Sequence, residues 1–198
     1  MSLLDLPSAL IPVVETFERL GVPYAVGGSI ASSSHGIMRA TIDVDLVVPL
    51  RHEDVNGLVS LLEENYYIDA SMIEEAIRRS ASFNLIHLES MTKIDIFILK
   101  SRPYDKHAFQ RRQKIRISKS AATPEVNIYS PEDTILNKLE WYQDGGEISE
   151  RQWSDILGVL KVQSTSLDFT YLRQWAKEIS VSGLLEKAFQ DVGLSEAP

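Results

Sequence analysis

The sequence predicts a mixed α/β fold in which helices flank a sheet, followed by a C-terminal helical region. Helical and strand-like periodicities alternate through the first half of the chain, and from residue 131 onward the apolar residues recur only at helical spacing. A chain of 198 residues with 44% hydrophobic residues is long enough for two small domains. We therefore expect a first domain over residues 1–122 and a helical domain over residues 123–198.

The N-terminal half is predicted to alternate helices and strands. An apolar stripe predicts a helix over residues 8–20, which Gly21 and Pro23 would end. Alternating apolar side chains predict a strand over residues 42–48. The other elements expected before residue 100 are strands at 24–26, 66–69, 83–88 and 93–99 and helices at 29–35, 52–64 and 72–79, with a hairpin connection at 89–92.

The C-terminal helices have a clear start signal. Ser130 is a candidate N-cap, Pro131 stands at the first helical position, and Asp133 occupies the third position of a capping box. The spacing of apolar residues then predicts four helices through residues 131–191. The stretch 120–133 before them is expected to be a crossing between the two regions.

Composition excludes several classes of protein. The absence of cysteine excludes disulfides and thiolate metal sites, and a net charge of −8 argues against a protein coated with basic surface. The N-terminus has no signal-peptide pattern, and no apolar run approaches membrane-spanning length, so we expect a cytoplasmic protein without membrane contact. Residues 100–119 hold eight basic residues against Asp105, which fits either a solvated face or a polyanion contact.

Three aspartates form a candidate metal site. Asp43 and Asp45 share one face of the strand predicted at 42–48, opposite a row of apolar residues. Asp95 stands in the same way opposite the apolar face of the strand at 93–99. Like charges on one strand face repel unless a cation lies between them, and oxygen ligands without His or Cys suit Mg²⁺ or Mn²⁺. The other interpretation is that each aspartate is merely solvated.

A glycine turn precedes this acidic strand. Gly27, Gly28 and Ser29 stand between a predicted strand and a predicted helix, where backbone N–H groups and the helix dipole can receive a phosphate. Taken alone, the two glycines are equally consistent with a tight turn. The motif gains meaning from the two aspartates that follow it at residues 43 and 45.

The run GGSIASSSHGIMRATIDVDLVV resembles the signature of the nucleotidyltransferase superfamily. The resemblance implies the fold of that superfamily. It further implies that Gly27, Gly28 and Ser29 hold the triphosphate of an NTP, while the three aspartates ligate metal ions. Arg39 and Thr41, just before the acidic strand, could touch phosphate or ribose or be ordinary turn residues.

The C-terminal runs SPEDTILNKLEW and RQWSDIL are similar to those of AbiEii-type nucleotidyltransferase-like proteins, some of which are toxins. That similarity implies that Lys138 reaches nucleotide phosphates and that Asp155 matters within an Arg-x-x-x-Asp element beginning at Arg151. Lys138 could equally be an ordinary surface residue. An antitoxin partner would follow from a toxin role.

The resemblance covers approximately residues 24–160 and implies a Mg²⁺-dependent enzyme. Such an enzyme transfers a nucleoside monophosphate from an NTP to an acceptor, which could be RNA, a protein or a small molecule. The alternative is a catalytically silent module of the same fold that binds nucleotide or a protein partner. The sequence leaves the acceptor, the preferred base and the oligomeric state open.

Overall fold

The computed structural model describes residues 5–37, 44–116 and 124–194. These residues form two compact units. The sheet unit comprises the described residues within 1–27 and 40–128, and the helical unit comprises those within 28–39 and 129–198. The predicted domain boundary at residue 122 falls outside the described residues and stays a prediction.

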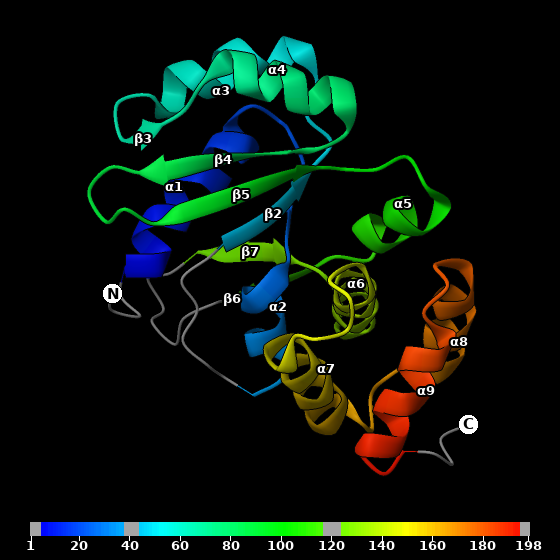
Figure 1. The fold of residues 1–198 in the computed structure, drawn as a ribbon. Helices are drawn as coiled ribbons and strands as arrows, with labels where there is room; N and C mark the ends of the chain where they lie inside the picture. Colours follow the sequence, from blue (N-terminus) through cyan, green and yellow to red (C-terminus); the bar gives the residue numbers. More distant parts are fainter. Residues whose placement is uncertain (1–4, 38–43, 117–123, 195–198) are drawn as a thin grey trace. The chain divides into compact units, whose positions relative to one another are not determined.

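The sheet unit contains a seven-stranded mixed sheet within the described part of the chain, in the order β3-β4-β5-β2-β1-β7-β6 (Figure 1). Two neighbouring pairs, β2 with β5 and β1 with β7, are parallel, and all other neighbours are antiparallel. The mixed α/β fold class is thereby confirmed. The strands are β1 (Ala25–Val26), β2 (Val44–Val48), β3 (Tyr66–Tyr67), β4 (Ser82–His87), β5 (Lys93–Ile98), β6 (Gln113–Arg116) and β7 (Glu125–Ile128).

Strand alternation gives the sheet one fully buried face. Val44, Leu46 and Val48 on β2 have no exposed surface, and neither do Ile94 and Ile96 on β5. Each such side chain contributes about 1.5–3 kcal/mol when it leaves water. Because side chains alternate along a strand, the residues between these apolar positions project together from the opposite face.

In its described residues, the sheet unit also contains four helices. They are α1 (Asp5–Arg19), α3 (Val55–Leu62), which follows a short 3₁₀ turn (His52–Asp54), α4 (Ala70–Arg79) and α5 (Pro103–Gln110). Helices α3 and α4 run side by side along the β4–β5 part of the sheet (Figure 1).

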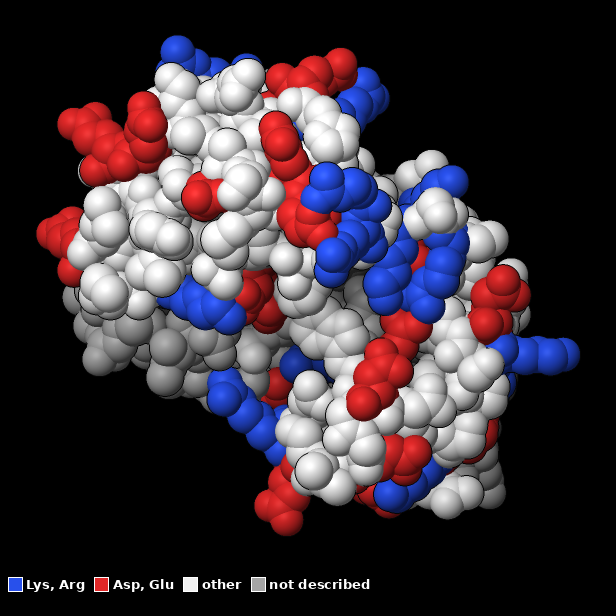
Figure 2. Space-filling model, turned by 45° about the horizontal axis from the view of Figure 1, so that its top comes forward, with Lys and Arg blue, Asp and Glu red and all other residues white. Residues whose placement is uncertain are grey.

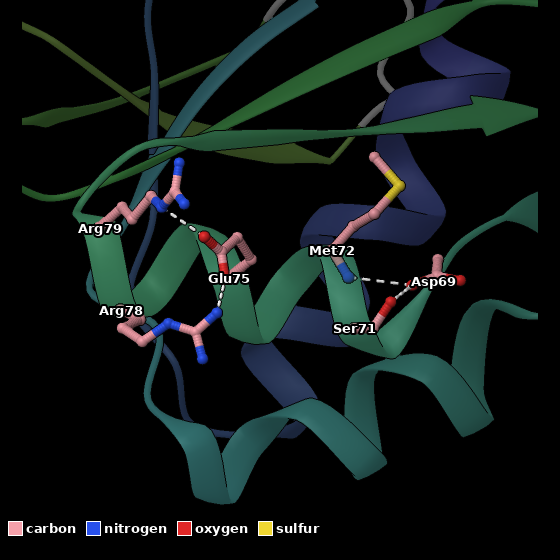
Figure 3. A network of polar contacts seen from close by, with 6 residues as sticks. All are labelled: Asp69, Ser71, Met72, Glu75, Arg78 and Arg79. Carbon is pink, nitrogen blue, oxygen red and sulfur yellow. Dashed lines mark hydrogen bonds and ion pairs between the residues drawn. The ribbon is translucent and has the colours of Figure 1, made fainter.

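Helix α4 is stabilised at both ends by its own side chains. At its start, the Asp69 carboxylate accepts hydrogen bonds from the Ser71 hydroxyl and the Met72 backbone N–H. Those two bonds lower the pKa of Asp69, the Ser71 bond most. In the last turn Glu75 forms ion pairs with Arg78 and Arg79 (Figure 3). The Asp69 cap thus fixes the start of helix α4, and the helix ends at the C-cap residue Ser80, whose φ of +49° is left-handed.

The helical unit contains α2 and the four predicted C-terminal helices. The predicted N-cap is confirmed, because the Ser130 side chain accepts from the Asp133 N–H, and Pro131 opens the helix as expected. The Asp133 carboxylate accepts from the Ser130 hydroxyl at 2.7 Å, whereas in a capping box it would accept from the Ser130 backbone N–H. These helices are α2 (Gly28–His35), α6 (Pro131–Asp144), α7 (Glu150–Gln163), α8 (Phe169–Glu178) and α9 (Ser182–Asp191).

The end of helix α2 approaches the backbone of helix α7 closely, so that one added methyl group there should lower the stability of the fold. A Cβ added at Gly36, just after α2, would lie 2.8 Å from the backbone nitrogen of Val159. We expect Gly36→Ala to lower the free energy of unfolding by about 1–3 kcal/mol, since the backbone must move apart. Thermal denaturation would measure this loss.

Gly183→Ala in α9 is the matched control, because a Cβ there would meet nothing within 4 Å. That change should be neutral or stabilise by about 0.4–1 kcal/mol. Equal stability of the two variants would contradict the close contact.

Three elements between residues 100 and 130 were not predicted. Helix α5 and strand β6 occupy the basic segment, and strand β7 lies within the predicted crossing, so that prediction was wrong over Glu125–Ile128. Only Val126 and Ile128 alternate in this short run, too little for periodicity to distinguish a strand from a loop. Pairing with β1 and β6 decides it.

Charged side chains are mixed on the surface. On the face shown in Figure 2, Lys and Arg lie in small groups beside Asp and Glu. Of the residues that the structure describes, none belongs to a helix long and apolar enough to cross a membrane.

Candidate functional site

Asp45 and Asp95 lie side by side on two neighbouring strands. Strands β2 and β5 are parallel, and Asp45 pairs in register with Asp95. Paired residues project from the same face of a sheet, and adjacent strands are about 4.8 Å apart. Both side chains are half-buried, whereas the flanking residues Val44, Leu46, Ile94 and Ile96 are buried on the other face. Two carboxylates therefore face one region of the sheet.

The neighbours of this pair hold both strands in place. Gly27 donates its backbone N–H to the Asp45 carbonyl at 2.9 Å, which fixes the end of β1 against β2. On the opposite side, Asn84 of β4 pairs in register with Asp95. Sequence reasoning did not single out Asn84, because its position beside Asp95 depends on the register of the β4–β5 hairpin.

A lysine contacts one member of the pair, Asp95. Lys93 Nζ lies 2.8 Å from Asp95 Oδ1 and donates a hydrogen bond of 2.9 Å to Oδ2. The two residues are separated by one position on β5 and therefore share a face. That spacing was visible in the sequence, but only the structure shows the ammonium in contact with both carboxylate oxygens.

The donor chemistry of the pair fits a hard divalent cation. Asp45 and Asp95 supply carboxylate oxygens, the ligand type that Mg²⁺ and Mn²⁺ take. The third expected ligand, Asp43, lies outside the described residues, as do Arg39 and Thr41. Among the described residues, no group of three or more His, Cys, Asp or Glu side chains could hold a metal. The three-aspartate site therefore stays a prediction.

The glycine turn has the backbone geometry of a tight connection. Gly28 has a φ of +53°, a conformation that residues with a Cβ rarely adopt, and helix α2 begins there. Ser29 follows in the first turn of α2, and its carbonyl accepts from the Ser32 hydroxyl at 3.2 Å. The assignment of Gly27, Gly28 and Ser29 to phosphate binding stays a prediction.

Lys138 and Asp155 form a buried ion pair between helices α6 and α7. Lys138 Nζ lies 2.8 Å from Asp155 Oδ2, and the two side chains are only 6% and 7% exposed. Two buried charges are tolerated because each compensates the other. The resemblance of the C-terminal runs indicates both residues but does not link them. A role of Lys138 at nucleotide phosphates, which stays a prediction, would require this pair to open.

A second polar cluster surrounds the start of α6. Tyr171 of α8 donates its hydroxyl to Asp133 Oδ1 at 2.6 Å, and the Asp168 N–H donates to Glu132 Oε1 at 3.1 Å. Asp133 is fully buried and Glu132 is buried. Buried polar groups of this kind stabilise a fold only when they are hydrogen-bonded. We assign this cluster to the packing of α8 against α6.

The buried side chain of His35 should make the stability of the fold depend on pH. Burial lowers the pKa of His35 from the ordinary 6.5, against the opposing effects of its contact with the Tyr129 carbonyl and the nearby charge of Glu132. The unfolded chain then binds a proton more readily than the folded chain does. The neutral form therefore stabilises the fold above pH 6.5, and this stabilisation is lost as the pH falls toward the lowered folded pKa.

We expect the urea midpoint to fall below pH 6.5 in the wild type. His35→Asn should show a smaller decrease over the same interval, and His107→Asn, at an exposed site, should behave like the wild type. Parallel curves for His35→Asn and the wild type would contradict the prediction.

The basic segment is partly neutralised within the sheet unit. Arg102 contacts both carboxylate oxygens of Asp105, at 2.6 and 2.9 Å. The Arg112 guanidinium lies over the Phe109 ring, 4.3 Å from its centroid, and donates to the Phe109 carbonyl. Several of these cations thus have structural contacts, and a role in binding an acceptor stays a prediction.

Comparison with known proteins identifies the fold. No family model matches the chain, and no curated protein matches its sequence. Among solved structures, the chain is similar to an antigenic nucleotidyltransferase-like protein from Paracoccidioides brasiliensis. The TM-score is 0.65 at 18% identity, over 98% of this chain and 93% of that chain.

Two further structures are antibiotic-modifying enzymes. ANT(2'')-Ia in complex with adenylyl-2''-tobramycin has a TM-score of 0.59 at 14% identity, over 89% of this chain and 97% of that chain. The lincomycin-bound lincosamide antibiotic adenylyltransferase LnuA has a TM-score of 0.51 at 15% identity, over 77% of this chain and 95% of that chain. The AbiEii-type assignment stays a prediction. The chain therefore shares its fold with these solved nucleotidyltransferase and nucleotidyltransferase-like structures.

Proposed function

We propose that this chain is a metal-dependent nucleotidyltransferase that transfers a nucleoside monophosphate from an NTP to a hydroxyl-bearing acceptor. One observation supports this most directly: Asp45 and Asp95 are in register on adjacent parallel strands and project from the same face of the sheet. The likeness in fold to structures of nucleotidyltransferases supports the same activity. A pair of merely solvated aspartates would need no such register.

In this proposal, one set of residues would bind the metal and another would bind the triphosphate. Asp43, Asp45 and Asp95 would hold Mg²⁺ or Mn²⁺, and Gly27, Gly28, Ser29 and Lys138 would hold the triphosphate. The bound metal would neutralise phosphate charge and act as a Lewis acid. The acceptor oxygen would bond to the α-phosphorus while the bond from that phosphorus to pyrophosphate breaks. Pyrophosphate would leave, and the hydroxyl proton would pass to water beside Asp95. Positioning of the two substrates supplies much of the rate.

The acceptor class is a further part of the proposal. The similar structures include one enzyme with an adenylylated tobramycin and one with lincomycin, so small hydroxylated molecules are the first class to test. RNA and protein acceptors follow, and they include the toxin role with its antitoxin partner. Growth arrest on expression that persists in Asp45→Asn would contradict an enzymatic toxin.

The test is transfer of label from each α-labelled NTP, with Mg²⁺, to separated small-molecule, RNA and protein fractions of a cell lysate. We expect the wild type to label one fraction and Asp45→Asn to label none. Glu89→Gln, which removes an exposed carboxylate from the β4–β5 hairpin, is the matched control and should label as the wild type does. Labelling by Asp45→Asn at the wild-type level would refute the proposal.

The second candidate is a catalytically silent module of the same fold. It is favoured by the Lys138–Asp155 contact, which engages the ammonium that is expected at the phosphates. Calorimetry with each NTP separates the two functions. Tight nucleotide binding without transfer to any lysate fraction would favour the silent module.

A further inference from the structure

The most informative contact around the aspartate pair is the one made by Lys93. Its ammonium lies within hydrogen-bond distance of both oxygens of Asp95, at 2.8 and 2.9 Å. A cation that binds Asp95 must approach the same oxygens, because a carboxylate ligates through its oxygen lone pairs. The ammonium and a divalent metal therefore compete for one carboxylate.

Lys93 is able to move away from this position. Its side chain is 48% exposed, whereas that of Asp95 is 21% exposed, so the ammonium can rotate into water while the carboxylate stays on the sheet face. Lysine has a flexible four-carbon stem and a strongly hydrated head. Exposed ion pairs of this kind contribute little to stability, and their opening is correspondingly easy.

We propose that Lys93 is a positioning residue whose ammonium holds the Asp95 carboxylate until a divalent cation displaces the ammonium. This inference rests on the proposed function. Strand register sets the face from which Asp95 projects, and the lysine holds the carboxylate on that face and balances its charge. It also lowers the affinity of the site for metal, because binding must break the ammonium contact and bring a second positive charge near the first.

Calorimetric titration of Mn²⁺ into the full chain tests this assignment. Lys93→Met keeps the apolar stem and removes the charge, so we expect Mn²⁺ to bind about three- to tenfold more tightly than to the wild type. Lys93→Arg keeps the charge and should bind no more tightly than the wild type. Lys114→Met, which removes an exposed charge from β6, should leave the affinity unchanged.

A chemical labelling experiment would detect the displacement of the Lys93 ammonium from Asp95 directly. Acetylation of Lys93 by an amine reagent, measured by mass spectrometry, should increase when Mn²⁺ is added to the wild type. In Asp45→Asn, the increase should be absent at the same Mn²⁺ concentration.

The outcomes separate this inference from the proposed function. If Mn²⁺ binding to the wild type does not depend on Asp45, the proposed function fails and this inference fails with it. If binding depends on Asp45 but Lys93→Met binds Mn²⁺ equally or more weakly, only the role of Lys93 is overturned.

Discussion

Replacement of Lys138 by methionine should lower the free energy of unfolding by about 3–5 kcal/mol. The substitution removes the ammonium that lies 2.8 Å from Asp155 and leaves a carboxylate that is only 7% exposed. Removing one member of a buried ion pair is costly, because the remaining charge has already given up its water and loses the ammonium that compensated it. Urea denaturation followed by circular dichroism would measure the loss.

Two variants make this prediction specific to the ion pair. Lys161→Met removes an exposed lysine from the same helix α7 that holds Asp155, and it should change stability little. The double variant Lys138→Met with Asp155→Leu removes both charges and should recover much of the lost stability. A urea midpoint for Lys138→Met equal to that of the wild type would show that the pair is dispensable.

Asp95→Asn should reduce nucleotidyl transfer at least about 100-fold, more than the loss typical of groups that only support a metal ligand. Asparagine keeps the shape of aspartate but removes the charge and one of the two ligating oxygens. The fold should persist, because the contact of Asp95 with Lys93, a lysine that is 48% exposed, is a surface ion pair. Initial rates with the labelled NTP, once an acceptor fraction is identified, give the measurement.

The control for this change is Glu125→Gln on strand β7 of the same sheet. Glu125 is 52% exposed and lies 3.8 Å from Arg116, so its substitution removes a carboxylate of the sheet without touching the aspartate pair. Its transfer rate should match that of the wild type. Retention of more than about one tenth of the activity in Asp95→Asn would remove Asp95 from the metal site.

Most elements before residue 100 could be predicted from the sequence, because their signals are local. The stripe that forms α1 and the alternation along β2 and β5 depend only on residues within one element. The Ser130 cap is equally local, since the hydroxyl and its partner N–H are three residues apart. Such local patterns do not depend on contacts with distant parts of the chain.

Long-range pairing could not be predicted in the same way. Strand β7 is four residues long and is defined by its neighbours β1 and β6, which come from distant parts of the sequence. The Lys138–Asp155 pair likewise depends on how α6 packs against α7. No periodicity within either helix indicates that a lysine and an aspartate 17 residues apart will meet.

The sequence by itself determined that Asp45 and Asp95 each stand opposite the apolar face of a strand, because alternation along a strand is a property of the backbone alone. Only the tertiary structure decided that β2 and β5 are parallel neighbours with these two residues in register. It also placed the Lys93 ammonium on both oxygens of Asp95. Register and side-chain contact are set by packing between elements, which no single segment encodes.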